Sequence, residues 1–458
     1  MITSRVAAAS GVRERGQALA LTVLVWTLIV LMIVPEGFDY SILIDTHAPT
    51  SGSAFSRLLW LALLVAAAGF VLRRAALAGW VVRELNPFLL AFVALALTSI
   101  AWSIEPVLTL RRDIRLLTMV LVCLAFVLGG WHRQRFQDVV RPVLTLMLLG
   151  SVLFGLVRPD LGIHQETSYE LLGAWRGLTN HKNTLGTLAC ITLIFWAHGW
   201  LAREVHLWRA LGGSALAVLC LCLSRSETSG IAAVLSVVML TLVMRTPRSM
   251  QPVTKMIVIA AVTALIVYAL AMLRLIPGLG VLLAPVTMLT DLDTSFTGRR
   301  EIWWIIHEHM QLHPLLGTGY GAYWSGPSPQ SPSYEFMLRM GSFYPGSAHN
   351  GYLEIANDLG WVGLLCLLGY VVNLVMQSLR LLTFDVAQAA LFIALLLQQA
   401  ITNLSESHWL SVLSVNFVIT TLATTALARA FVDQRLRQRA ARARTGHMNP
   451  ATITAAST

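Results

Sequence analysis

Hydrophobic and polar residues along this chain fall into long blocks. Twelve apolar runs, each close to the length that an α-helix needs to cross the hydrocarbon layer of a membrane, are separated by polar segments. The runs cover residues 17–34, 57–72, 87–102, 116–131, 139–157, 184–201, 210–223, 230–244, 256–273, 359–379, 386–403 and 410–427. This pattern predicts an all-α, polytopic integral membrane protein with about 12 transmembrane helices.

The composition supports this class. Of 458 residues, 56% are hydrophobic and only 12% are charged, which excludes an ordinary soluble domain. Between the ninth and tenth runs lies a long polar interval that can hold a small subdomain. We therefore predict a cytoplasmic N-terminus (1–16), transmembrane helices 1–9 (17–273), a large periplasmic loop with amphipathic helices (274–352), transmembrane helices 10–12 (353–428) and a basic cytoplasmic tail (429–458).

The basic residues predict the orientation, because short loops rich in Lys and Arg stay in the cytoplasm. With the N-terminus inside, the inner segments hold 21 of the 33 Lys and Arg residues, so both termini are expected in the cytoplasm. The net charge of +10 raises the question of nucleic acid. Because the Arg-rich stretch 429–444 directly follows the last apolar run, we expect it to contact anionic lipid at the inner surface, and no nucleic acid.

The large loop contains a predicted surface helix and a predicted lid. Thr297 is a suitable cap for a helix over 299–312 that Pro314 ends, and its two tryptophans, Trp303 and Trp304, suit the headgroup zone. The Pro- and Ser-rich stretch GPSPQSPS and a short apolar segment, 334–340, follow. These features are typical of a segment that moves over a site.

Four basic residues lie where the positive-inside tendency disfavours them. Arg176 and Lys182 in WRGLTNHKN, Arg225 in SRSETSG and Arg299 in TGRREIWW all border apolar runs on the predicted outer face. Each could pair locally, with Glu170, Glu227 or Glu301 as the nearest acidic residues. Together they could instead bind a diphosphate on a lipid carrier, which arginine grips with two parallel hydrogen bonds.

Histidines offer two further kinds of chemistry. His349, in AHNGYLE, is either a hydrogen-bonded structural residue or a general base, since imidazole titrates near neutral pH. HEHMQLH places three histidines in one helix, but the zincin pattern needs a histidine at 311, where Gln311 stands. We predict no metal and no cofactor. GTGYG, residues 317–321, is expected to form a tight turn that needs a flexible backbone.

The motifs together resemble the O-antigen ligase and polymerase superfamily of bacterial membrane glycosyltransferases. The resemblance rests on SRSETSG, on TGRREIWW followed by HPLLGTGYGAYW, and on AHNGYLEIANDLGWVGLL, in this order. It implies a large periplasmic loop over a central cavity in the inner membrane. It also implies a glycan donor on undecaprenyl diphosphate and inverting, metal-independent transfer to a sugar hydroxyl.

Carried over by motif position, Arg225 and Arg299 match the arginines that hold the diphosphate, and His349 matches the base. The predicted substrate contacts are Arg176, Lys182, Asn350, Glu227, Tyr320 and Glu406, with His408 as a further candidate. WRGLTNHKN is closer to the exopolysaccharide polymerases, which extend a glycan, than to the ligases, which transfer it to lipid A core. Both remain open here, as does a transporter or flippase for the same lipid-linked glycan. The oligomeric state is not predicted.

Overall fold

The structure is a computed structural model that describes residues 2–35, 53–166, 171–273, 278–279, 281, 299–341 and 343–446. Every element longer than a single bridge in these ranges is helical, and the isolated pair Ile163 and Trp175 forms the bridge. The helices are α1 (Ile2–Ile33), α2 (Ala54–Arg73), α3 (Ala75–Glu84), α4 (Pro87–Thr98), α5 (Pro106–Leu128), α6 (Arg135–Val157), α7 (Pro159–Gly162), α8 (Lys182–Leu201), α9 (Leu207–Ser224), α10 (Glu227–Arg245), α11 (Gln251–Met272), α13 (Arg299–Leu312), α14 (Glu335–Arg339), α15 (Gly351–Leu381), α16 (Val386–Thr402) and α17 (Val415–Gly446). The predicted all-α class is confirmed.

Each of the twelve apolar runs lies largely in a helix, although the last one begins five residues before α17, and the count of about twelve spans is not confirmed. Within the described ranges, nine helices are long and apolar enough to cross a membrane, or ten if the bent pair α3 and α4 is one span. The helix α5 carries four charged residues between 111 and 115, which shortens its apolar part, and α16 has only 17 residues. The charge of α5 and the short length of α16 therefore explain why these two helices are not among the nine.

The bend between α3 and α4 has a local cause. The chain bends by 105° between the two helices. Pro87 is the first residue of α4, a position where the missing N–H of proline is tolerated. The Asn86 side chain caps α4 through a 3.0 Å bond from the Phe88 N–H, and its amide donates to the Tyr370 carbonyl at 2.9 Å. The second contact fixes the bend against α15.

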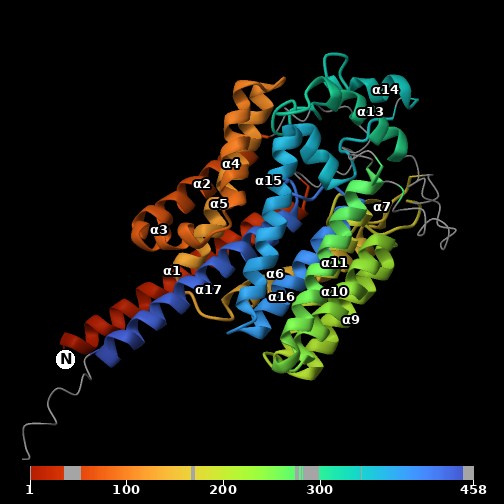
Figure 1. The fold of residues 1–458 in the computed structure, drawn as a ribbon. Coiled ribbons are helices and arrows are strands. Elements are labelled where there is room, and N and C mark those ends of the chain that lie inside the picture. The colour runs from red at the N-terminus through yellow and green to blue at the C-terminus, as the bar shows by residue number, and fades with distance from the viewer. Residues whose placement is uncertain are drawn as a thin grey trace, which may run out of the picture.

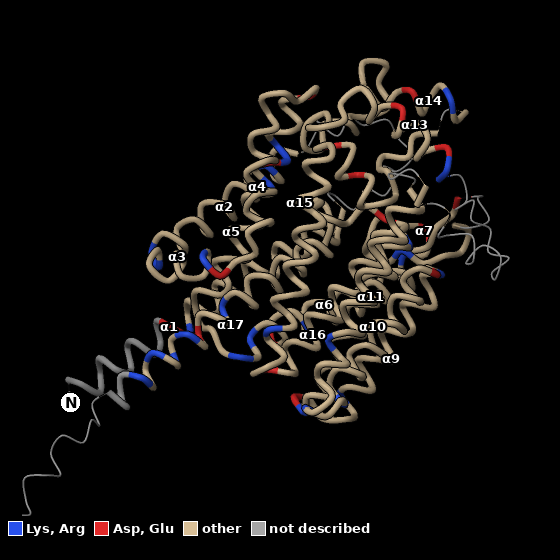
Figure 2. Tube along the Cα trace, viewed as in Figure 1, with Lys and Arg blue, Asp and Glu red and all other residues tan. Residues whose placement is uncertain are grey.

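Charged residues gather toward the two ends of the bundle, and its middle is almost free of them (Figure 2). The first turns of α1 and the last turns of α17 lie together at one end, whereas α13 and α14 lie at the opposite end (Figure 1). We call the end with α13 and α14 the outer end, and the other the inner end. The start of α1 and the end of α17 therefore lie on the same side of the bundle (Figure 1).

The predicted helix over 299–312 is confirmed as α13, and its predicted cap, Thr297, lies outside the described residues. Trp303 is buried, and its indole N–H donates to the Ala348 carbonyl at 3.0 Å, whereas Trp304 is exposed. Only Trp304 is therefore available to a headgroup zone. The packing of Trp303 connects α13 to the segment that leads into α15.

The basic tail also makes contacts within the protein. The last helix, α17, extends to Gly446, and Arg435 forms an ion pair with Glu84 at the end of α3. The Arg439 guanidinium lies 4.7 Å from the centre of the Trp80 ring. Part of the tail's charge is thus used to hold α17 against α3.

Candidate functional site

Glu406 lies in the turn that connects α16 to α17. Asn403, at the end of α16, is fully buried and accepts hydrogen bonds from the backbone N–H groups of His408 and Trp409 at 2.9 and 2.6 Å. The Glu406 N–H donates to the Thr402 carbonyl at 3.0 Å. These contacts satisfy the backbone at the helix end, so the turn has a defined shape.

His349 lies in a second turn that packs against the first. Asn350 caps α15, because its side-chain oxygen accepts two N–H groups of the first turn, both at 3.1 Å. The Gly351 N–H donates to the Asn403 carbonyl at 3.0 Å, and a Cβ at this position would lie 1.9 Å from Asn403 Oδ1. Only glycine permits this approach, which holds His349 beside the Glu406 turn.

A second carboxylate, Glu354, holds the two turns together. Its Oε2 accepts hydrogen bonds from the Ala348 N–H at 2.6 Å and from the Ser407 hydroxyl at 3.0 Å. Ser407 Oγ in turn accepts the Asn350 N–H at 3.2 Å. Glu354 was not singled out as a candidate from the sequence, although a buried acid at the start of an apolar helix is itself a functional signal.

Two predicted residues, Arg299 and His349, meet at Glu406. Its Oε1 lies 3.4 Å from an Nη of Arg299, and its Oε2 lies 3.5 Å from Nδ1 of His349. A residue not predicted, Asn183 in the first turn of α8, donates to Oε1 at 2.5 Å. Glu406, a lesser candidate in the sequence, is therefore the centre of the cluster. We call Arg299, His349, Glu406 and Asn183 the outer cluster.

The charge of Glu406 is stabilised where it stands. Burial by itself would raise the pKa of the carboxyl, but the neighbouring His349 and the charge of Arg299 hold this pKa well below its usual range. Glu406 is therefore an anion at any physiological pH. Beside it, burial lowers the pKa of His181 to about 4, so this imidazole is neutral. Its Nδ1 accepts the Asn183 N–H at 3.2 Å, which leaves the remaining proton on Nε2.

Backbone strain marks two of the predicted catalytic residues. Among the described residues, only four that are not glycine have a positive φ, and they include Arg225 at 50° and His349 at 47°. Such a conformation costs about 1–3 kcal/mol and persists only where the surroundings impose it. Its occurrence at these two residues supports a functional reading of both.

Arg176 lies in the loop between α7 and α8, and Lys182 is the first residue of α8, next to Asn183 of the outer cluster. The guanidinium of Arg176 is buried, donates to the Leu161 carbonyl at 2.6 Å and lies 3.7 Å from Glu166. Its acidic partner is thus Glu166, and the proposed partner Glu170 lies outside the described residues. The Lys182 backbone N–H donates to His164 at 3.1 Å, which fixes the start of α8.

Arg225 is on the neighbouring hairpin between α9 and α10. It is exposed and donates to the Leu172 carbonyl at 3.1 Å, and a further bond of 3.0 Å joins the Trp175 N–H to the Leu223 carbonyl. Arg225 thus contacts the loop that leads into α8, but it makes no direct contact with the outer cluster within the described residues. Glu227 is exposed in the first turn of α10.

The GTGYG segment forms the tight turn that its glycines predict. Gly317, Gly319 and Gly321 all have positive φ, and a Cβ on Gly321 would lie 2.2 Å from the Arg112 side chain. Tyr320 is buried, and its hydroxyl donates to the Leu410 carbonyl at 2.6 Å. In this structure Tyr320 thus serves packing, as Asn350 serves capping.

Three further histidines, His307, His309 and His408, are held by contacts within the protein. His307 lies 2.6 Å from the Leu273 carbonyl, and the His309 ring packs on Tyr323 with 4.4 Å between centroids. His408 Nδ1 lies 3.0 Å from the Ser414 hydroxyl. Within the described ranges, no group of three or more His, Cys, Asp or Glu residues is arranged to hold a metal ion.

Comparisons of the amino-acid sequence with known proteins give the following matches. The family described as "O-Antigen ligase" matches residues 212–368, which include Arg225, Arg299 and His349. The exopolysaccharide production protein ExoQ of Rhizobium meliloti (strain 1021) is 31% identical over 309 residues. The aligned region covers 65% of this chain and 66% of that protein, just under two thirds of its length.

Proposed function

Since the chain belongs to the O-antigen ligase and polymerase superfamily of bacterial membrane glycosyltransferases, we propose that it polymerises an exopolysaccharide from a glycan carried on undecaprenyl diphosphate. The observation that carries the proposal is the meeting of Arg299 and His349 on Glu406, from segments that are far apart in the sequence. In this proposal the outer end faces the periplasm and both termini are cytoplasmic, as the basic residues predict.

His349 is the proposed general base. With Nδ1 directed at Glu406, Nε2 is the nitrogen that accepts the proton of an acceptor sugar hydroxyl. The hydroxyl oxygen attacks the anomeric carbon as the bond to the phosphate oxygen breaks, and the electron pair leaves with the diphosphate. A single displacement of this kind inverts the anomeric configuration. Glu406 stabilises the imidazolium that forms.

Arg299 and Arg225 are the proposed contacts of the diphosphate. Negative charge grows on the leaving group in the transition state, and fixed guanidinium groups stabilise it best where water is excluded. Arg299 is only partly exposed, and among the described residues it contacts Glu406 through one Nη at 3.4 Å, so its other N–H groups can contact phosphate oxygens. Arg225 is exposed beside the loop that carries Lys182, so this rim offers the ligand several cations.

The test is glycosyl transfer by the purified full-length protein in detergent, supplied with a lipid-linked glycan and an acceptor glycan. We expect a product that is one glycan unit heavier and has the opposite anomeric configuration, formed equally well with excess chelator. Loss of turnover with chelator would reject the metal-independent mechanism. Bilayer flipping of the donor, without any new glycosidic bond, would instead indicate a transporter.

A ligase is the second candidate, because the matching family is described as "O-Antigen ligase". The two reactions share their donor and differ in the acceptor, which is another glycan for a polymerase and lipid A core for a ligase. Deletion of the gene separates them. Loss of long secreted polysaccharide supports the polymerase, whereas intact O-chains that are not attached to lipid A core would favour the ligase.

A further inference from the structure

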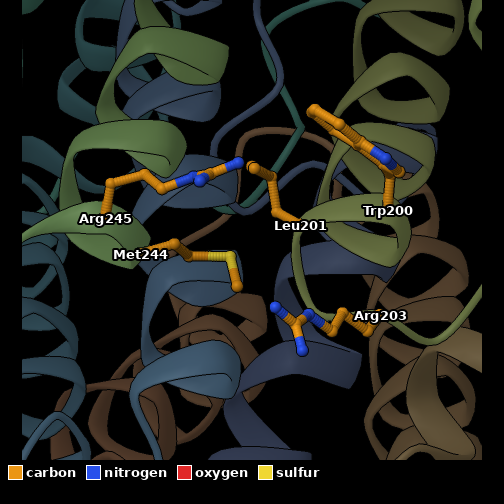
Figure 3. Close-up of a pocket in the computed structure, with 5 residues that line it drawn as sticks. All are labelled: Trp200, Leu201, Arg203, Met244 and Arg245. Carbon is orange, nitrogen blue, oxygen red and sulfur yellow. The ribbon is translucent and has the colours of Figure 1, made fainter.

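A cavity of about 420 Å³ opens at the inner end, far from Glu406 along α8. It lies between the last turns of α8 and α10, and it is lined by Trp200, Leu201, Arg203, Met244 and Arg245. The two guanidinium groups and the Met244 side chain extend from opposite walls toward the same space (Figure 3). We call this cavity the inner pocket.

The charges of the inner pocket are not balanced by the protein. Within the part of the chain that the structure describes, neither the Arg203 nor the Arg245 guanidinium makes an ion pair or a side-chain hydrogen bond. The nearest carboxylate in sequence, Glu204, is buried and lies 2.6 Å from Arg141. Each guanidinium therefore keeps its N–H donors available for an anion that comes from outside the protein.

Neighbouring segments add to this positive charge. The inner ends of α8, α9, α10 and η4 (Arg248–Met250), with the first turns of α11, contribute five cations: Arg203, Arg209, Arg245, Arg248 and Lys255. Glu204 is the sole carboxylate in these same segments, 198–209 and 244–256, and it is used by Arg141. The last carbonyls of α8 and α10 offset part of the charge, since cations are favoured at helix C-termini. They do not supply the oxygens of an anion.

The apolar part of the lining indicates the kind of anion. Leu201 from the α8 side and Met244 from the α10 side supply apolar lining, and Trp200, with 45% of its surface exposed, lines the pocket beside Leu201. Trp208, also exposed, follows in the first turn of α9. Exposed tryptophans next to arginines are typical of the boundary between hydrocarbon and water. A ligand here thus meets positive charge and apolar surface together.

We infer that the inner pocket binds the phosphodiester headgroup of an anionic phospholipid, with Arg203 and Arg245 on the phosphate and the apolar side chains beside the glycerol and first methylene groups. Basic pockets between transmembrane helices on the cytoplasmic side recognise such headgroups. This site is separate from the proposed donor site at the outer end, and its existence does not depend on the proposed reaction.

The experiment is native mass spectrometry of the full-length protein in detergent, titrated with phosphatidylglycerol or with phosphatidylcholine of the same chains. We expect tighter binding of phosphatidylglycerol, and a roughly 30-fold loss of that affinity in R203Q/R245Q, because each guanidinium contributes about 1 kcal/mol through its direct contact with the phosphate. The matched control is R209Q/R248Q, which removes the same charge from the same end but no contact with the bound phosphate, and should lose less than about 3-fold. R203K/R245K should retain affinity within a few-fold.

Three results would overturn the inference. Equal losses in both glutamine double variants would show a general effect of charge. Unchanged phosphatidylglycerol affinity in R203Q/R245Q, in protein that elutes as a folded species, would exclude the pocket. Binding of glycerol phosphate with the same dependence on Arg203 and Arg245 would assign the site to a soluble phosphate instead of a lipid.

Discussion

Two clusters of the same residue types lie at opposite ends of this protein. At the outer end, Arg299 and His349 meet Glu406 at 3.4 and 3.5 Å, and the three side chains are 14–26% exposed. At the inner end, Arg141 lies 2.6 Å from Glu204, with both side chains less than 10% exposed. His198 lies 3.8 Å from the same carboxylate, and its Nε2 is 3.0 Å from the Ala387 carbonyl.

The two clusters differ in which side-chain groups remain available to a ligand. In the inner triad of Arg141, Glu204 and His198, the histidine uses its second nitrogen on the backbone and the ion pair is short and buried. In the outer cluster the distances are longer, the side chains reach solvent, and His349 stands on a strained backbone. Arg, Glu and His therefore suit a structural lock where the ion pair is short and buried, and a site that a ligand can reach where the side chains are exposed to solvent.

The largest expected difference between the clusters is in turnover. His349→Gln removes the proposed base and should lower polymer formation about 10²–10⁴-fold. His198→Gln, the matched change in the inner triad, should lower it less than about 10-fold, because His198 faces a backbone carbonyl. Secreted polysaccharide from complemented deletion strains, normalised to the protein in the membrane, measures both. Similar losses in the two variants would remove the distinction.

Arg299→Gln should lower turnover about 10²–10³-fold, the usual effect of removing one group that stabilises a developing anion. Arg299→Lys should recover only part of this loss, because an ammonium group cannot form two parallel hydrogen bonds. Combining Arg299→Gln with Glu406→Gln should cost less than the sum of the two single changes, since the residues share one contact. Strict additivity in the rates would show that Arg299 and Glu406 act separately.

Substitutions in the inner triad should lower the stability of the folded protein. Arg141→Met leaves the buried Glu204 carboxylate without its partner and should destabilise the protein by about 3–5 kcal/mol. Adding Glu204→Gln should recover most of this loss, since no buried charge then remains. Thermal unfolding in detergent, followed by circular dichroism, tests both variants. A melting temperature that Arg141→Met leaves unchanged would contradict the role of the triad as a lock.

The same contrast explains which features of the fold and of the site could be predicted from the sequence. Each apolar run lies largely in a helix, because hydrophobic length is a local property, and motif position alone predicts Arg299 and His349 as site residues. Glu406 is only a lesser candidate in the sequence, because its partners Asn183 and Arg299 lie 223 and 107 residues away along the chain. The local pairing of Arg176 with Glu166 and the capping role of Asn350 likewise depend on how loops fold back, which residue spacing does not encode.

The smallest predicted effect concerns pH at the outer cluster. The pKa of His181 is about 4 in the folded protein, below its ordinary 6.5, so the unfolded chain binds a proton first as the pH falls. Stability should therefore be greatest above pH 6.5 and should decline toward pH 4, with this residue contributing on the order of 3 kcal/mol. His181→Gln should flatten the decline in melting temperature over this range. An identical decline in the variant would assign it to other groups, such as His164 and His408, whose pKa values burial also lowers.

The outer cluster's role in chemistry is tested most directly by single-turnover transfer from a bound lipid-linked donor, with wild-type protein and His349→Gln compared at equal donor occupancy. The account predicts that the variant binds donor as well as the wild type and forms the glycosidic bond at least about 10²-fold more slowly. Transfer within a few-fold of the wild type would contradict it, as would a loss of donor binding equal to the loss of transfer.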